Sequence, residues 1–170
     1  MPAEHSARPG DAAAAPDLAP TQLVRALLAR QGHVDLPASG QSMYPYIRDG
    51  QLCRFVLLDG PPRRGQVLLL ATADGRLVGH RYWRRTQLGA DVRYICRGDS
   101  NRLPDAPVAP DQVLGRLLWI RAGARLRHAQ GLAPGIWALA VSELEPLRRA
   151  IRSALRRRRQ RGAQAGGLGP

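Results

Sequence analysis

Short apolar runs separated by glycine and proline clusters set the strongest limit on how this chain can fold. From Leu36 onward these runs are rich in Val, Leu and Ile, and their lengths are typical of strands. We therefore expect a mainly β domain of antiparallel sheets over residues 36–122, with helices flanking it on the N-terminal and C-terminal sides. The expected strands lie near residues 51–58, 66–72, 76–85, 92–97 and 112–121.

The segments before and after this region differ from it in composition. Residues 1–20 are rich in Ala and Pro and lack an apolar core, so they predict a disordered tail and neither a secretory signal nor a membrane anchor. Residues 21–32 predict a short helix with Thr21 as its cap and Gly32 as its stop. Residues 161–170, which are rich in Gly, predict a flexible tail.

Residues 134–160 have the spacing of one basic amphipathic helix. Such a helix either lies against an anionic membrane surface or packs its apolar stripe on the β domain, and periodicity does not separate the two. The uncharged segment 131–142 is shorter than the about twenty residues that span a bilayer. We expect a cytoplasmic protein that is at most peripheral to a membrane. The apolar stripe is Trp137, Val141, Leu144, Leu147, Ile151 and Leu155, and the arginines are Arg148, Arg149, Arg152 and 156–159.

The charge composition favours an anionic partner. The chain has a formal net charge of +13, and every basic residue other than histidine is arginine, because the sequence contains no lysine. The abundance of Ala, Gly and Arg together is equally typical of a coding bias. No helix-turn-helix or aromatic RNA-binding motif is present, so nucleic acid is not the expected partner.

The two cysteines show no metal-binding spacing. Cys53 and Cys96 fall in separate expected strands, without a CxxC motif. We expect two buried thiols, with a disulfide between them as the alternative, and we expect neither a metal site nor a cofactor.

Ser42 is the candidate nucleophile. It lies in a loop from Gly40 to Gly50 that is bounded by glycines and stiffened by proline. A serine hydroxyl needs a neighbouring base, and without lysine the base must be a histidine. Of the four histidines, only His80 lies in a strand-like run. Side chains alternate along a strand, so His80 and Arg81 should point to opposite faces.

Three groups of residues around these positions resemble, in sequence and order, the type I signal peptidase family. They are Gly-x-Ser-Met-x-Pro from Gly40, Gly-His-Arg from Gly79, and Arg-Gly-Asp-Ser-Asn from Arg97. The related self-cleaving repressors of the SOS response are similar in the same way. The resemblance covers residues 36–122 and places His80 where eukaryotic-type signal peptidases have histidine and bacterial ones have lysine.

The resemblance implies a serine-type endopeptidase that hydrolyses a peptide or protein substrate through an acyl-enzyme. Ser42 would be the nucleophile, His80 the base, and Asp105 the carboxylate that orients His80. Asp99 competes for this orienting role and is otherwise expected to support its loop.

The resemblance also bears on the residues that surround the nucleophile. The Ser42 backbone N–H is the expected first donor to the oxyanion. Signal peptidases usually have a hydroxyl residue two positions before the nucleophile, whereas this chain has Gly40, so the second donor is open. Met43 is expected to pack beneath the nucleophile loop.

Two other functions remain open from the sequence. One is a self-processing or catalytically silent relative that acts as a regulator. The other is a basic module that binds a membrane or nucleic acid. We expect the peptidase because three matching groups in family order are more specific than charge alone.

Overall fold

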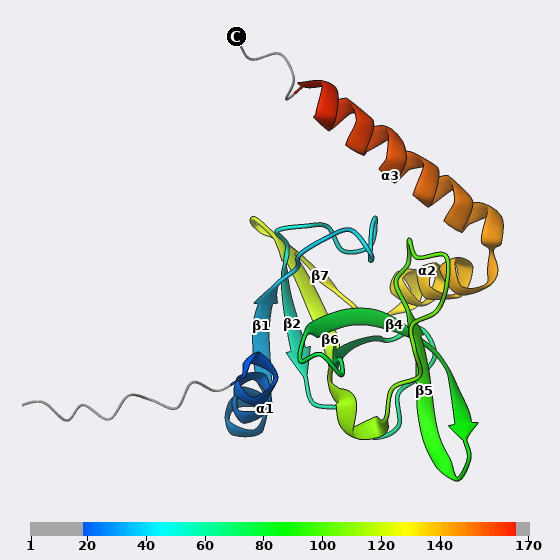
Figure 1. Ribbon diagram of the computed structural model, residues 1–170. Coiled ribbons are helices and arrows are strands. Elements are labelled where there is room, and N and C mark those ends of the chain that lie inside the picture. The colour runs from blue at the N-terminus through cyan, green and yellow to red at the C-terminus, as the bar shows by residue number, and fades with distance from the viewer. Residues whose placement is uncertain (1–18, 166–170) are drawn as a thin grey trace, which may run out of the picture.

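The computed structural model describes residues 19–165, and within them the fold is mainly β (Figure 1). The expected N-terminal tail therefore lies largely outside the described residues, and so does the part of the expected C-terminal tail that follows Ala165. The strands form one antiparallel sheet in the order β1-β2-β6-β3-β4-β5, and β7 pairs with β6. The elements are α1 (Pro20–Gln31), β1 (His33–Pro37), β2 (Leu52–Val56), β3 (Val67–Ala71), β4 (Leu77–Leu88), β5 (Asp91–Arg97), a short 3-10 helix (Pro110–Gln112), β6 (Val113–Ala122), β7 (Arg125–His128), α2 (Leu132–Glu143) and α3 (Glu145–Ala165).

The sheet extends beyond the expected domain boundaries of 36–122 at both ends. The five expected strands are present, but β1 begins at His33 and β7 ends at His128. Strand β1 is held by pairing with β2, which follows it only after the long Ser42 loop. All four residues of β7 are exposed, and Leu126 is its one apolar residue. The segment therefore shows no apolar alternation from which a strand could be predicted.

Helix α1 confirms the expected N-terminal helix, with one correction at its start. The helix begins at Pro20, whose fixed φ suits the first turn, and Thr21 is therefore not its cap. Gly32 ends it in the left-handed conformation (φ 73°) and donates its N–H to the Leu28 carbonyl. Leu28 is buried in the core, so α1 packs on the sheet.

The single helix expected over 134–160 is two helices. Pro146 has no N–H with which to continue α2, and Leu144 is extended (ψ 92°). Helix α3 then runs to Ala165, past the expected start of the flexible tail. Its apolar stripe is packed, because Ile151 and Leu155 are buried. The exposed apolar side chains lie instead on α2.

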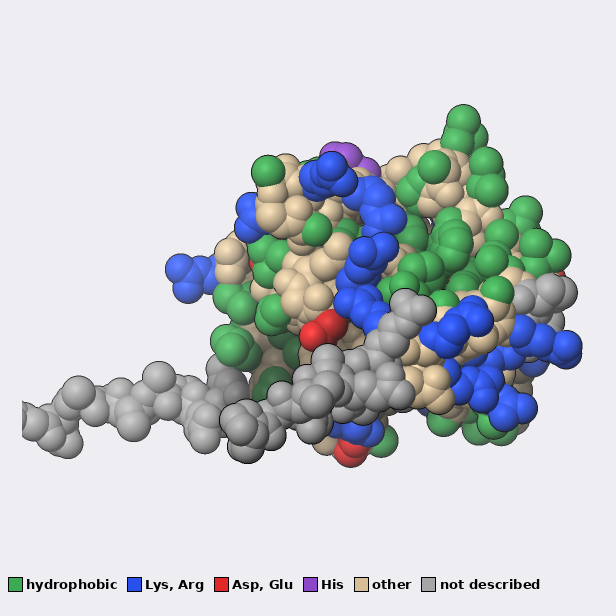
Figure 2. Space-filling model, turned by 90° about the horizontal axis from the view of Figure 1, so that it is seen from above, with side chains coloured by type: hydrophobic (Ala, Val, Ile, Leu, Met, Phe, Trp, Pro, Cys, Tyr) green, Lys and Arg blue, Asp and Glu red, His purple; other side chains and the backbone are tan. Residues whose placement is uncertain are grey.

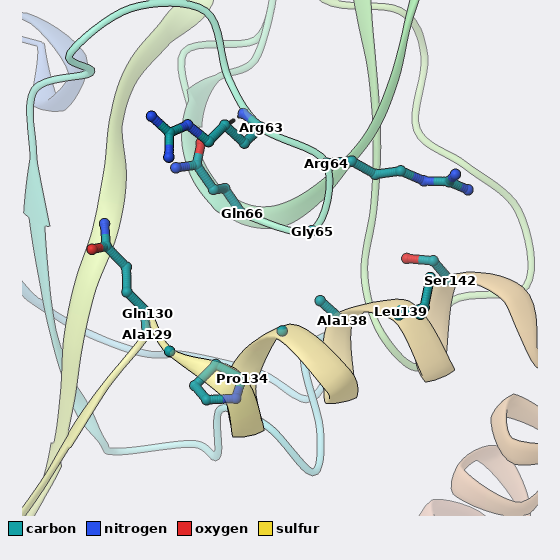
Figure 3. Close-up of a pocket in the computed structure, with 12 residues that line it drawn as sticks. Arg63, Arg64, Gly65, Gln66, Ala129, Gln130, Pro134, Ala138, Leu139 and Ser142 are labelled. Carbon is teal, nitrogen blue, oxygen red and sulfur yellow. Dashed lines mark hydrogen bonds between the residues drawn. The ribbon is translucent and has the colours of Figure 1, made fainter.

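Helix α2 is held against the loop before β3. A Cβ on Gly65 would lie 2.7 Å from the Ala138 Cβ, so only glycine allows this close approach. Gly65 and Ala138 both line a cavity of about 500 Å³ (Figure 3). None of Ser42, His80 and Asp105 lines this cavity.

None of the helices within residues 19–165 has both the length and the apolar composition needed to cross a bilayer.

The described residues form three buried apolar clusters, and the two cysteines lie in different ones. Cys53 is buried in the larger cluster with Phe55 and Leu117, and Cys96 is buried in the smaller one with Leu68 and Tyr82. Both cysteines are free and buried, as expected, so the disulfide alternative is wrong.

Burial makes both thiols unreactive in the folded protein. Desolvation raises the pKa of Cys53 to about 11 and, together with the nearby charge of Asp105, the pKa of Cys96 to about 12. At about pH 8 the reactive thiolate is therefore scarce. We expect iodoacetamide to label neither cysteine of the native protein on a timescale that labels both in concentrated guanidinium chloride. Rapid labelling of the native protein, followed by mass spectrometry, would contradict this expectation.

Candidate active site

The loop that carries Ser42 is held from both sides. Gly40 has a positive φ of 86°, and its N–H donates to the Asp49 carboxylate at 2.8 Å, which closes the base of the loop. Met43 is buried in the larger core cluster, as expected. The Ile47 N–H donates to the Met43 carbonyl at 2.9 Å. The loop is therefore a compact turn that presents Ser42 at its surface.

His80 contacts both of its expected partners. It lies on β4 opposite Leu68 of β3 and is 7% exposed. Its Nε2 lies 2.9 Å from Ser42 Oγ, and its Nδ1 lies 2.6 Å from Asp105 Oδ2. Because Nδ1 faces a carboxylate, it carries the ring proton, and Nε2 is then the acceptor for the serine hydroxyl. The three side chains form one chain of hydrogen bonds.

Asp105 reaches His80 because the segment after β5 turns back along it. The Asp105 N–H donates to the Cys96 carbonyl at 2.9 Å, which fixes the carboxylate beside the neighbouring strand β4. Asp99 makes no such contact with His80 in the described part of the chain. The tertiary structure thus separates the two carboxylates that compete for this position in the sequence.

Asp99 is bound instead to Arg81, the residue after His80. Two parallel hydrogen bonds of 2.7 Å join the Arg81 guanidinium to the Asp99 carboxylate, and both side chains are almost fully buried. The guanidinium also donates to the Gly65 carbonyl at 2.7 Å. Trp137 of α2 donates its indole N–H to Asp99 at 3.0 Å. This cluster joins β4, the loop after β5 and helix α2 beneath the site.

Ser100 and Gly98 hold the nucleophile loop against the loop after β5. The Ser100 N–H donates to the Ser42 carbonyl at 2.9 Å, and its hydroxyl reaches the Gln41 carbonyl at 2.8 Å. A Cβ on Gly98 would lie only 2.7 Å from the Ser42 carbonyl oxygen. These positioning roles could not be predicted from the sequence, although both residues lie in the Arg-Gly-Asp-Ser-Asn group.

The oxyanion donors are only partly defined by the loop. Among the described residues, none accepts a hydrogen bond from the Ser42 N–H, so this donor could serve an oxyanion. The Gly40 N–H is bound to Asp49 and does not serve as the second donor. The role of Gly40 is to shape the loop.

Two cavities meet at Ser42. One, of about 380 Å³, is lined mainly by apolar residues of 36–40 and 77–79 and also by His80. The other, of about 1140 Å³, lies between the loop residues 100–103 and helix α3. Ser42 lines both cavities, so an extended chain bound across it would enter each of them.

Among the side chains that the structure describes, no group of three or more His, Cys, Asp or Glu is placed to hold a metal ion.

Comparisons with known proteins do not place the chain in a family. No protein-family model matches it, and a search of curated proteins found no match.

Loss of the buried carboxylate of Asp99 should destabilise the fold strongly. We expect Asp99→Ala to lower the free energy of unfolding by about 3–5 kcal/mol, because the Arg81 charge is left buried without its partner. Asp74→Ala is a matched control, since Asp74 pairs with Arg76 on the surface, and it should leave stability almost unchanged. Urea unfolding measures both, and equal shifts would contradict the expectation.

Proposed function

We propose that this protein is a serine peptidase that hydrolyses peptide bonds with Ser42, His80 and Asp105. The observation that carries the proposal is the unbroken chain of hydrogen bonds from Ser42 Oγ through the imidazole to the Asp105 carboxylate. A nucleophile, a base and a group that orients the base are the parts that acyl transfer requires. The resemblance of residues 36–122 to signal peptidases supports the same reaction.

Each of the three residues has a defined role in this reaction. Ser42 Oγ attacks the substrate carbonyl while its proton passes to His80 Nε2, and the Ser42 N–H donates to the developing oxyanion. His80 then gives the proton to the leaving amine, which departs as the peptide bond breaks and leaves an acyl-enzyme. A water molecule, deprotonated by His80, hydrolyses the ester and restores Ser42. Asp105 holds the tautomer of His80 and stabilises the imidazolium in both steps.

Peptide cleavage tests the proposal. We expect the wild type to cleave members of a diverse peptide library detected by mass spectrometry. Ser42→Ala should abolish cleavage, and His80→Ala should slow it about 10²–10⁴-fold. Asp105→Asn should slow cleavage while leaving the unfolding midpoint nearly unchanged, because Asp105 is part-exposed.

Asp111→Asn is the matched control, since this exposed acid lies outside the site and should leave the rate unchanged. Equal cleavage by the wild type and Ser42→Ala would overturn the proposal. The absence of cleavage by the wild type and every variant would overturn it as well.

We also propose that α2 rests on an anionic membrane surface. Leu132, Ile136 and Leu139 are 87%, 68% and 61% exposed and recur at helical spacing on α2. Helix α3, which carries the arginines, contacts α2, and Figure 2 shows hydrophobic and basic side chains side by side on the face of the molecule seen there. An apolar face beside arginines is the combination that an interfacial helix needs.

Vesicle sedimentation tests this attachment. We expect the protein to sediment with vesicles that contain phosphatidylglycerol and much less with vesicles of phosphatidylcholine alone. Ile136→Asp should reduce binding about tenfold, because it puts a charge into the apolar face. Leu88→Asp changes an equally exposed apolar residue in the distant β4–β5 hairpin and should bind like the wild type. Equal loss in both variants would contradict the proposal.

A further inference from the structure

The cavity between the loop residues 100–103 and helix α3 is lined by positive charge. Arg102 lies on the loop side, and Arg149, Arg152 and Arg156 lie on the helix side. No acidic side chain is among the residues that line it. Its volume of about 1140 Å³ is ample for several residues of an extended peptide.

Packing holds these arginines close to the nucleophile. Ile151 and Leu155 of α3 are buried in a cluster against which Tyr44, two residues after Ser42, also packs. The Arg158 guanidinium lies 5.9 Å from the centre of the Tyr44 ring. Helix α3 is therefore attached to the nucleophile loop, and its cationic side forms one wall of the cavity.

The two cavities at Ser42 differ in chemistry. The first is lined largely by apolar side chains and takes up apolar residues of a bound chain. The second offers the guanidinium groups of Arg102 and Arg156, and guanidinium groups form paired, charge-assisted hydrogen bonds with carboxylates. A peptide that lies across Ser42 therefore meets an apolar wall on one side of the reacting bond and a cationic wall on the other.

We propose that the arginine-lined cavity binds acidic side chains of the substrate, on the side of the scissile bond opposite the apolar cleft. This inference rests on the proposed peptidase activity and defines its substrate class. The occupant should be part of the substrate, because Ser42 itself belongs to the wall. A bilayer presents a broad surface of headgroups, whereas this site is concave and bounded by the nucleophile.

Charge-neutral variants isolate the role of the cavity. Arg102→Gln and Arg156→Gln each remove one charge from opposite walls, and the double variant removes both. Arg157→Gln is the matched control, because it removes the same charge from the next residue of α3, which does not line the cavity. Circular dichroism is the check that each of the four variants is folded.

Cleavage of peptide sets that differ only in one residue tests the preference. Each set carries Glu, Gln or Lys at successive positions on either side of the cleaved bond. We expect the wild type to cleave Glu peptides at least about tenfold faster than Lys peptides, at positions on one side only. The double variant should lose this preference, and Arg157→Gln should keep it. The inference is overturned if the wild type shows no charge preference, or if Arg157→Gln loses the preference as much as the double variant does. In either case, cleavage of the peptides would still support the proposed peptidase function.

A binding measurement decides the inference even if no peptide is cleaved. Fluorescence anisotropy of a fluorescein-labelled peptide with two central Glu residues is compared with its Gln and Lys forms, using Ser42→Ala as the background. We expect the Glu form to bind more tightly than the Gln and Lys forms. Its affinity should fall at least fivefold when Arg102 and Arg156 are both replaced, and it should also fall with added salt. No Glu preference overturns the inference. Loss of binding to phosphatidylglycerol vesicles in the double variant, without change in peptide preference, overturns it in favour of a lipid site.

Discussion

The buried ion pair between Arg81 and Asp99 is the interaction on which the arrangement of the site depends. It joins strand β4 to the loop after β5, and the same carboxylate receives the indole N–H of Trp137 from α2. Burying two charges is costly unless their hydrogen bonds are satisfied, and here the guanidinium is also bound by the Gly65 carbonyl. The pair therefore requires the sheet, the loop and the helix to be in place together.

The alternation of side chains along β4 links this ion pair to the position of His80 beside Ser42. Arg81 points toward the buried pair, so its neighbour His80 points to the opposite face, toward Ser42 and Asp105. A shift of β4 by one residue would exchange the two side chains and destroy both contacts at once. The strand register that stabilises the fold is therefore the register that brings the imidazole to the serine.

Ser42 lies between two chemically different cavities, so the two sides of the site would bind different kinds of side chain. The apolar cleft is built from the end of β1 and the start of β4, both part of the sheet. The cationic cavity depends on α3, which comes from the end of the chain and packs near the nucleophile loop through Ile151 and Leu155. In the proposed peptidase, the sheet would supply catalysis and apolar recognition, and the C-terminal helix would add a preference for charge.

The sequence by itself determined the mainly β fold, helix α1 and the burial of both thiols, and it predicted which histidine lies beside Ser42. Apolar runs between glycine clusters predict strands locally, and in a chain without lysine His80 is the one histidine in a strand-like run. The tertiary structure decided that Asp105 and not Asp99 contacts His80, because this depends on how the segment after β5 folds back. It also decided that β1 and β7 join the sheet, that Ser100 holds the Ser42 carbonyl, and that arginines of α3 line a cavity beside the nucleophile. These features depend on contacts between residues far apart in the chain, which neither local propensity nor periodicity encodes.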